Sequence, residues 1–155
     1  MMHGRTSAFT LLELTVVLII IAVGTGLVVP MIEAGINARE VRRAAREIAS
    51  TLHFCRDEAV ALGKAQQVVI DPLRNSIYVS DRSRWATLTD RAVIERAEGD
   101  GVPINGMARV LCFPNGATSG ADVVLASRAD RSRQRLRIRF DPLIGRVEVE
   151  TLDAG

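Results

Sequence analysis

The sequence contains few cysteines and histidines, the residues from which zinc sites are most often built. Its 155 residues include two cysteines, Cys55 and Cys112, and two histidines, His3 and His53. No pair of them has the spacing of zinc ligands, so we expect neither a metal ion nor another cofactor. Lysine is almost absent, and 20 basic against 18 acidic residues leave a formal net charge of only +2. That charge is too small to predict a polyanionic partner.

Catalytic patterns are equally scarce. The segment GATSG, residues 116–120, differs from a nucleophile elbow because its serine comes one place too late. No serine or carboxylate is placed to complete a triad with His53, and a structural histidine on a helix is the simpler interpretation. We therefore expect the protein not to be an enzyme.

One apolar block near the start accounts for much of the 48% hydrophobic content. Residues 14–32 carry no charge and would span about 28 Å as a helix, close to the bilayer's hydrocarbon thickness of about 30 Å. A secretory signal peptide would have an apolar core of about 7–15 residues and an A-x-A-like cleavage site, and neither is found here. We predict a leader over residues 1–8 and a membrane-spanning helix over residues 9–32.

Glu13 places a carboxylate inside this apolar block. A charge at membrane depth costs several kcal/mol unless it finds a partner, and no Lys or Arg lies within the neighbouring helical turns. A cut just before Phe9 would create a positive amino terminus at a similar depth. Between parallel chains offset along their axes, that amine could meet a neighbour's Glu13 and specify a filament. The alternative is that Glu13 reaches the membrane interface and is solvated there.

The leader, the motif FTLLE at residues 9–13 and the long apolar helix together resemble the class III signal of type IV pilins and pseudopilins. The resemblance implies that a prepilin peptidase cuts between Ala8 and Phe9 and methylates the new amine of Phe9. It also implies that Glu13 governs subunit assembly. The family usually carries Gly before the cut, where this chain has Ala8, the next smallest residue, so we expect cleavage to be retained.

Gly24, Gly26 and Pro30 form a weak zone within the predicted helix. An interior Gly costs about 1 kcal/mol relative to Ala, and an interior Pro about 3 kcal/mol. Pilin helices also carry a proline where this chain has Pro30. We predict that the helix bends here when the subunit leaves the bilayer for a filament, the alternative being that the glycines serve close packing.

Beyond the span, an apolar stripe at alternating spacings of four and three predicts an amphipathic continuation of the helix over residues 33–63. Gly63 is the expected helix stop. The stripe consists of Val41, Ala45, Ile48, Leu52, Cys55, Ala59 and Leu62. Because this stripe must be covered, we predict an α+β fold in which the long helix packs on a small antiparallel β-sheet domain, residues 64–155.

Two hairpins in this domain use the same turn pattern. Residues 68–70 and 77–79 flank DPLRN, and residues 136–140 and 147–149 flank DPLIG. Asp and Pro open each turn, and Asn75 or Gly145 supplies positive φ at its exit. Further strands are predicted at residues 109–113 and 122–126. Residues 80–106 suggest an extended loop with a short strand near Val93.

Alternation along the second hairpin predicts its register. If Ile138 faces Val147, then Leu136 faces Val149, and all four share one side with Phe140. The same register sets Arg137 opposite Glu148 and Arg135 opposite Glu150 on the other side. Apolar residues inside and paired charges outside are typical of a half-buried antiparallel sheet.

This β region resembles the C-terminal domain of the GspH/FimT family of pilin-like pseudopilins. The resemblance rests on FPNG at residues 113–116, SG at 119–120, and DP and GRV at 141–142 and 145–147. It implies a minor pseudopilin of a type II secretion system, at the tip of a periplasmic pseudopilus that drives export of folded proteins across the outer membrane. Expected partners are the prepilin peptidase, other minor and major pseudopilins, the inner-membrane secretion platform and, before assembly, the lipid bilayer.

The flanking charges disagree with this resemblance about orientation. Arg39, Arg42, Arg43 and Arg46 follow the apolar block and outnumber Arg5 of the leader. The positive-inside rule would place the C-terminal domain in the cytoplasm. The resemblance implies a single-pass protein of the bacterial inner membrane with this domain in the periplasm, and we adopt that expectation.

Two alternatives stay open at this point. One is a minor pilin of a type IV pilus with a DNA-binding role in transformation, which would use the arginines that alternate over residues 131–139. However, Glu148 and Glu150 can pair with two of these arginines, and no aromatic residue lies between them for stacking on bases. Nucleic acid is therefore not an expected partner. Cys55 and Cys112 form either a disulfide between helix and sheet or two separate buried thiols.

Overall fold

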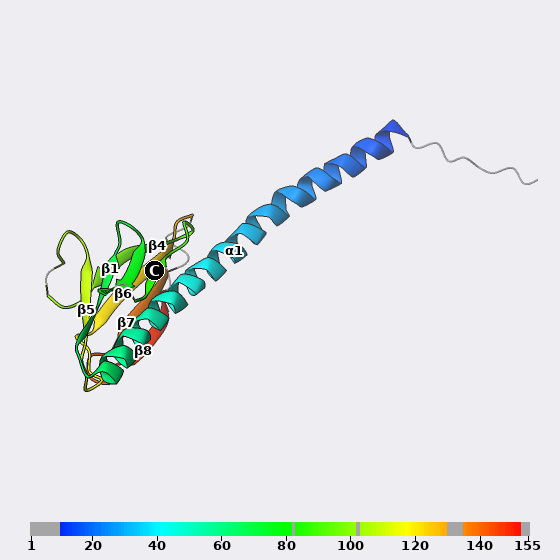
Figure 1. Cartoon of the computed structure of the whole chain (residues 1–155). Coiled ribbons are helices and arrows are strands. Elements are labelled where there is room, and N and C mark those ends of the chain that lie inside the picture. The colour runs from blue at the N-terminus through cyan, green and yellow to red at the C-terminus, as the bar shows by residue number, and fades with distance from the viewer. Residues whose placement is uncertain (1–9, 82, 102, 130–134, 153–155) are drawn as a thin grey trace, which may run out of the picture. The chain divides into compact units, whose positions relative to one another are not determined.

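The computed structural model describes residues 10–81, 83–101, 103–129 and 135–152, with the side chains of residues 26–34 outside the description. The chain divides into two compact units, Met1–Ile36 and Asn37–Gly155. Helix α1 (Leu11–Leu62) begins in the first unit and ends in the second (Figure 1). The strands, all in the second unit, are β1 (Gln66–Asp71), β2 (Ser76–Val79), β3 (Trp85–Thr87), β4 (Ala92–Glu98), β5 (Ala108–Cys112), β6 (Ala121–Ser127), β7 (Arg135–Phe140) and β8 (Val147–Leu152).

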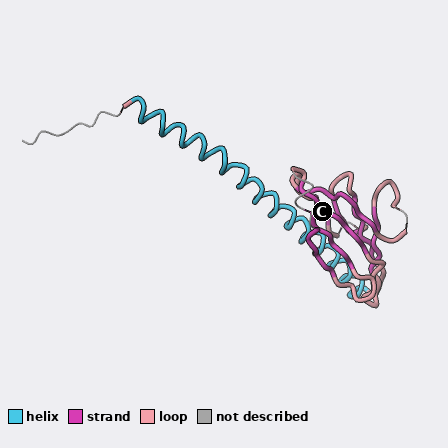
Figure 2. The backbone as a smooth tube through the Cα atoms, turned by 180° about the vertical axis from the view of Figure 1, so that it is seen from behind, coloured by secondary structure: helices cyan, strands magenta, loops and turns pink. Residues whose placement is uncertain are grey.

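The α+β prediction is confirmed, but the strands form two sheets where the sequence analysis predicted one. One sheet has the order β3-β2-β1-β5 and the other β4-β6-β7-β8, with every neighbouring pair antiparallel. Figure 2 shows the strands of both sheets beside the part of α1 that belongs to the second unit. Side chains from both sheets and from α1 join in one core cluster, with Ile48, Ile70 and Phe140 among its largest members.

The predicted stripe is the buried face of α1 with one exception. Six of its seven members are buried, whereas Leu62 is 56% exposed. Leu62 is the last residue of the helix, and Gly63 follows with a φ of 62°. The N–H of Lys64 bonds to the carbonyl of Ala59 and the N–H of Gly63 to that of Val60, which is the Schellman arrangement. The chain turns away at this point, so the side chain of Leu62 lies beyond the core.

Both predicted hairpins form, and their turns are built in the same way. The Asp71 carboxylate accepts the N–H groups of Leu73 and Arg74, both at 3.0 Å. The carboxylate of Asp141 accepts the corresponding N–H groups two and three residues later at 2.8 and 3.0 Å. Asn75 and Gly145 have φ values of 51° and 60°, as predicted.

The predicted register of the second hairpin is wrong by two residues. Ile138 pairs with Val149 and Phe140 with Val147, so that Arg137 lies opposite Glu150. The turn is longer than predicted by two residues, because Phe140 lies opposite Val147 where the predicted register would place it opposite Gly145. The N–H of Asp141 bonds to the carbonyl of Arg146 at 2.8 Å, inside this longer turn. A shift of two preserves the faces of the sheet, so the apolar and charged sides are the ones predicted.

Residues 80–106, predicted as an extended loop with one short strand, contain β3 and the seven-residue β4. The register of β4 against β6 shifts between Ile94 and Arg96, which is a β-bulge or similar irregularity. The irregularity interrupts the period-two pattern that identifies a strand in a sequence. Contacts from another turn also hold β4, because Asn75 donates to the carbonyl of Ala92 at 2.7 Å and accepts the N–H of Ile94 at 3.0 Å.

Candidate functional site

The predicted assembly residue Glu13 lies in the first turn of α1. The hydroxyl of Thr10 accepts the N–H of Glu13 at 3.2 Å, so Thr10 caps the helix. Thr followed three residues later by Glu is the sequence of a capping box, and an acidic side chain in the first turn is favourable to the helix dipole. This capping signal was missed from the sequence, where Glu13 was interpreted as a carboxylate at membrane depth. Ala8 and Phe9, the predicted cleavage and methylation site, lie outside the described residues.

The first unit presents an apolar helix surface. The large hydrophobic side chains between Leu11 and Val23 are exposed, by 81% and 59% at these two ends. Two threonine hydroxyls of this unit bond to their own helix: that of Thr15 donates to the carbonyl of Leu12 at 2.8 Å, and that of Thr25 donates to the carbonyl of Ile21 at 2.9 Å. These bonds leave few free polar groups on the surface, as an apolar environment requires.

Helix α1 is continuous through the weak zone formed by Gly24, Gly26 and Pro30. A Cβ atom added at Gly24 would meet nothing within 4 Å, so close packing within the described residues does not require this glycine. The side chains of Gly26 and Pro30 belong to the segment outside the description, and the bend stays a prediction. Within the described residues, none of the helices is both long and apolar enough to cross a membrane.

The motifs of the β region that resemble the GspH/FimT family come together near the end of α1. The N–H of Thr118 bonds to the carbonyl of Pro142 at 2.9 Å, which joins the loop before β6 to the turn between β7 and β8. Arg56 of α1 donates from Nε to the carbonyl of Gly116 at 3.1 Å. A Cβ atom added at Gly145 would lie 2.5 Å from that Nε and 3.0 Å from the Gly116 oxygen. Arg56 thus fastens both loops to the helix, a role that no local sequence pattern signals.

Asp141 holds the second of these loops together. Hydrogen bonds from the backbone N–H groups of Ile144 and Leu143 lower the pKa of Asp141 below its usual value. The hydroxyl of Thr118 also donates to the carbonyl of Asp141 at 3.2 Å. The loop geometry therefore depends on an ionised carboxylate.

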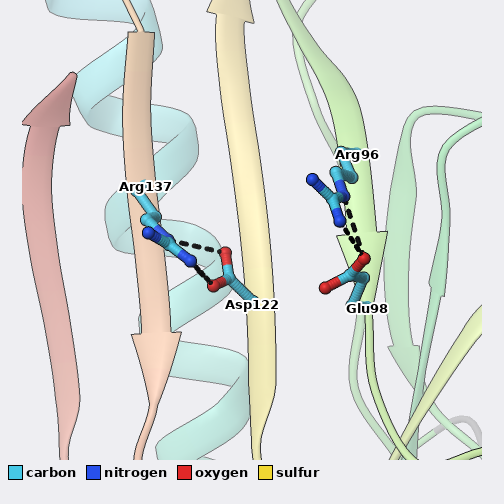
Figure 3. A network of polar contacts seen from close by, with 4 residues as sticks. All are labelled: Arg96, Glu98, Asp122 and Arg137. Atoms are coloured by element: carbon cyan, nitrogen blue, oxygen red, sulfur yellow. Dashed lines mark hydrogen bonds and ion pairs between the residues drawn. The ribbon is translucent and has the colours of Figure 1, made fainter. Parts of the chain in front are cut away.

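The charged face of the second sheet is largely paired. Figure 3 shows Arg137 of β7 bonded to Asp122 of β6, and Arg96 bonded to Glu98 within β4. The bonds to Asp122 raise the pKa of Arg137, and Arg135 pairs with Glu95. The partners differ from the predicted Glu148 and Glu150 because carboxylates on β6 and β4 approach the arginines more closely.

Cys55 and Cys112 lie together in the core. Both thiols are free and fully buried. The pKa of the Cys55 thiol is raised above its ordinary value, mainly by the hydrogen bond with Cys112 and secondly by burial. The thiols are therefore neighbours, and a disulfide between them stays a prediction. Among the described residues, no cluster of three or more His, Cys, Asp and Glu side chains could hold a metal ion.

No family model and no curated protein matches the sequence, but solved structures resemble the fold. The minor pseudopilin EpsH from the type 2 secretion system of Vibrio cholerae matches with a TM-score of 0.57 and 14% identity, over 72% of this chain and 97% of that chain. The type IV minor pilin FimU of Pseudomonas aeruginosa strain PAO1 matches with a TM-score of 0.58 and 12% identity, over 75% and 95%. A second EpsH structure matches with a TM-score of 0.52 and 16% identity, over 76% of this chain and 96% of that chain. The protein has a GspH/FimT-like pilin fold.

At these identities the likeness is one of fold alone, and it covers about three quarters of the chain. Within the GspH/FimT-like pilin fold, the motifs of the β region are loops whose contacts with Arg56 and with each other hold the sheet against α1. Their sequence pattern therefore has an architectural role in this fold.

Proposed function

We propose that this protein is a minor pseudopilin of a type II secretion system. It is anchored in the bacterial inner membrane by residues 9–32, processed by a prepilin peptidase, and assembled with other pseudopilins into the periplasmic pseudopilus that drives export of folded proteins. The pilin fold of the second unit supports the filament class, and the uncharged sequence over residues 14–32 supports the anchor.

The observation that carries the proposal is the exposed apolar surface of the first unit with a single carboxylate near its start. Side chains from Leu11 to Val23 cannot remain in water without cost, about 25 cal/mol for each Å². Before assembly the bilayer covers them, and afterwards the helices of neighbouring subunits do. A soluble enzyme would have no use for such a surface.

Glu13 directs the second of these steps. After cleavage, the amine of Phe9 lies four residues before Glu13, about 6 Å along a helix. Pairing between the amine of one subunit and Glu13 of the next neutralises both charges and sets the axial offset between subunits. The bond between Glu13 and Thr10 uses the backbone N–H of Glu13, so it does not require the Glu13 carboxylate.

The decisive test is the intact mass and N-terminal sequence of the full chain extracted from cells with and without prepilin peptidase. A mature chain that begins at methylated Phe9 only in cells with the peptidase supports the proposal. A chain that begins at Met1 or Met2 in both cells contradicts it. As a matched control, Ala8→Gly installs the residue usual in this family and should give the same product.

The role of Glu13 can be separated from its place in the capping box. Glu13→Gln keeps the cap, because Gln serves equally well at this position, but removes the charge. We expect this variant to be cleaved normally and to be absent from assembled filaments. Normal incorporation would show that the charge is dispensable and that Glu13 acts only as a capping residue.

A minor pilin of a type IV pilus is the second candidate, favoured by the similar match to FimU. Deletion of the gene distinguishes the two. Loss of secreted proteins with pili intact supports a pseudopilin, whereas loss of pili with secretion intact supports a minor pilin. A DNA-binding role finds little support in the paired face of Arg135 and Arg137, and we expect the full chain to bind DNA weakly.

A further inference from the structure

A groove of about 500 Å³ runs along one side of α1 within the second unit. One wall is formed by Arg39, Arg42 and Arg46, and the floor by Leu136 of β7 with Val149 and Thr151 of β8. We call this surface the arginine groove. It is separate from the charged outer face of the same sheet, because Val149 pairs with Ile138, whose side chain lies in the core on the side that faces α1.

The guanidinium groups of the arginine groove lack acidic partners. Arg39, Arg42 and Arg46 are exposed, and none of them pairs with an Asp or Glu among the residues whose side chains are described. Elsewhere in the second unit, Arg135 and Arg137 do have such partners. The groove therefore carries an uncompensated positive charge over an apolar floor.

The floor ends at an open strand edge. Of the described strands, only β7 pairs with β8, which is the last strand of its sheet. The opposite edge of that sheet, β4, is blocked by the Asn75 side chain, which bonds to Ala92 and Ile94. Val149 is 48% exposed beside the open edge. An unprotected edge next to apolar surface is a template for another strand.

We infer that the arginine groove binds an extended acidic segment of another protein, which adds to the edge of β8 as a further strand. In this arrangement the segment's backbone pairs with β8, and every second side chain points toward α1. Carboxylates at those positions meet the arginines. The intervening side chains point to the outer face, where they lie beside Glu148 and Glu150. Basic residues are favoured at these positions because they can pair with those carboxylates.

The spacing of the arginines agrees with this arrangement. Arg39 and Arg46 are seven residues apart, about 10 Å along the helix. Alternate residues of a strand are about 7 Å apart, so two or three acidic residues in alternation span the arginine wall. Carboxylates that bind guanidinium groups gain charge-assisted hydrogen bonds.

A second copy of this chain does not fit the same edge. If two β8 strands paired antiparallel about a two-fold axis, Glu148 and Glu150 of both copies would crowd the same outer face and repel each other. The groove of each copy would receive only Val149 and Thr151, and the arginines would stay unpaired. The occupant is therefore not a second β8 strand, and an acidic segment supplies the charges that the arginines lack.

The probe for the experiment is a capped eight-residue peptide in which Glu and Lys alternate, labelled with a fluorophore and titrated with the full chain in nonionic detergent. We expect saturable binding by fluorescence anisotropy. Methylation of alternate backbone nitrogens, which keeps every charge, should weaken binding at least about tenfold because the strand can no longer pair with β8. Equal binding of the methylated peptide, or no saturation below about 1 mM, would overturn the inference.

Arg42 and Arg43 provide a matched pair of variants. Both are exposed on the same helix turn, but Arg43 lines a different groove, toward β3. Arg42→Gln should weaken peptide binding about tenfold and Arg43→Gln less than about twofold. Equal effects would indicate a diffuse basic surface, contrary to the inference. If nanodiscs of phosphatidylglycerol abolish binding that phosphatidylcholine nanodiscs support, the arginines bind a lipid surface and the inference is wrong.

Discussion

Substitution of Gly145 by Ala tests whether Arg56 fastens the loops to the helix. A Cβ atom at this position would lie 2.5 Å from Nε and 2.6 Å from Cδ of Arg56. These atoms are in the middle of the side chain, so Arg56 must move, and its bond to the carbonyl of Gly116 at 3.1 Å is lost. The new residue must also hold a φ of 60°.

Two costs contribute to the expected loss of stability. A residue with a Cβ atom in the left-handed region costs about 1 kcal/mol. A hydrogen bond from a charged donor contributes about 1.5–3 kcal/mol, and because the Arg56 side chain is 35% exposed, the lower end of that range applies. We therefore expect Gly145→Ala to lower the free energy of unfolding by about 2.5 kcal/mol.

The matched control is Gly63→Ala. Gly63 has a φ of 62°, but an added Cβ atom would meet nothing within 4 Å, so this variant should lose only about 1 kcal/mol. Unfolding of the full chain by urea in nonionic detergent can be followed by fluorescence of Trp85, the single tryptophan. Trp85 reports on the fold because its ring stacks on that of Tyr78 at 4.8 Å.

A double-mutant cycle decides the cause. In an Arg56→Ala background the clash is largely gone, so Gly145→Ala should cost about 1 kcal/mol, the backbone strain alone. If Gly145→Ala lowers the free energy of unfolding no more than Gly63→Ala does, or by the same amount with and without Arg56, then Arg56 does not fasten the loops to the helix.

Three further predictions concern the same domain. Asp141→Asn should destabilise the fold at neutral pH. Backbone hydrogen bonds lower the folded-state pKa of Asp141. Its contribution to the free energy of unfolding is therefore complete above the unfolded-state pKa, about 3.9, and disappears as the pH falls through the folded-state pKa. Urea midpoints of the wild-type chain and of the variant should converge between pH 7 and pH 2. In protein folded under reducing conditions, Cys55 and Cys112 should resist iodoacetamide until urea is added, since both thiols are buried; rapid labelling of the native protein, detected by mass, would contradict this burial. Leu52→Ala should cost about 3 kcal/mol through an internal cavity, whereas Leu62→Ala should cost less than about 0.5 kcal/mol because that side chain is mostly exposed; similar urea midpoints for the two variants would refute the assigned core face.

Local signals in the sequence predicted much of the fold. The period of the apolar residues identified the buried face of α1, and Gly63 was the correct helix stop because a Schellman ending needs positive φ. The Asp-Pro turns predicted both hairpins and the positive φ of Asn75 and Gly145. The register of the second hairpin was missed by two residues because alternation distinguishes faces but not shifts by an even number. The first hairpin has the same register relative to its Asp-Pro turn, with Ile70 opposite Ile77.

The candidate sites divide in the same way. Glu13 and the apolar helix around it could be identified from the sequence, because a charge within an apolar run is visible in a single segment. The arginine groove could not, since Arg42 and Val149 are about a hundred residues apart and only the folded chain brings them together.

The sequence by itself determined the elements whose causes are local: the long helix with its cap and stop, the hairpin turns, and the alternation that gives each strand an inner and an outer face. These depend on backbone preferences and on hydrogen bonds within a few residues. Only the tertiary structure decided that the strands divide into two sheets, that β4 forms beside β6 despite its irregular pairing, that Arg56 clasps two distant loops, and that β8 remains an open edge. Those outcomes depend on which surfaces can be buried together, because the free energy of burial comes from contacts between segments that are far apart in the sequence.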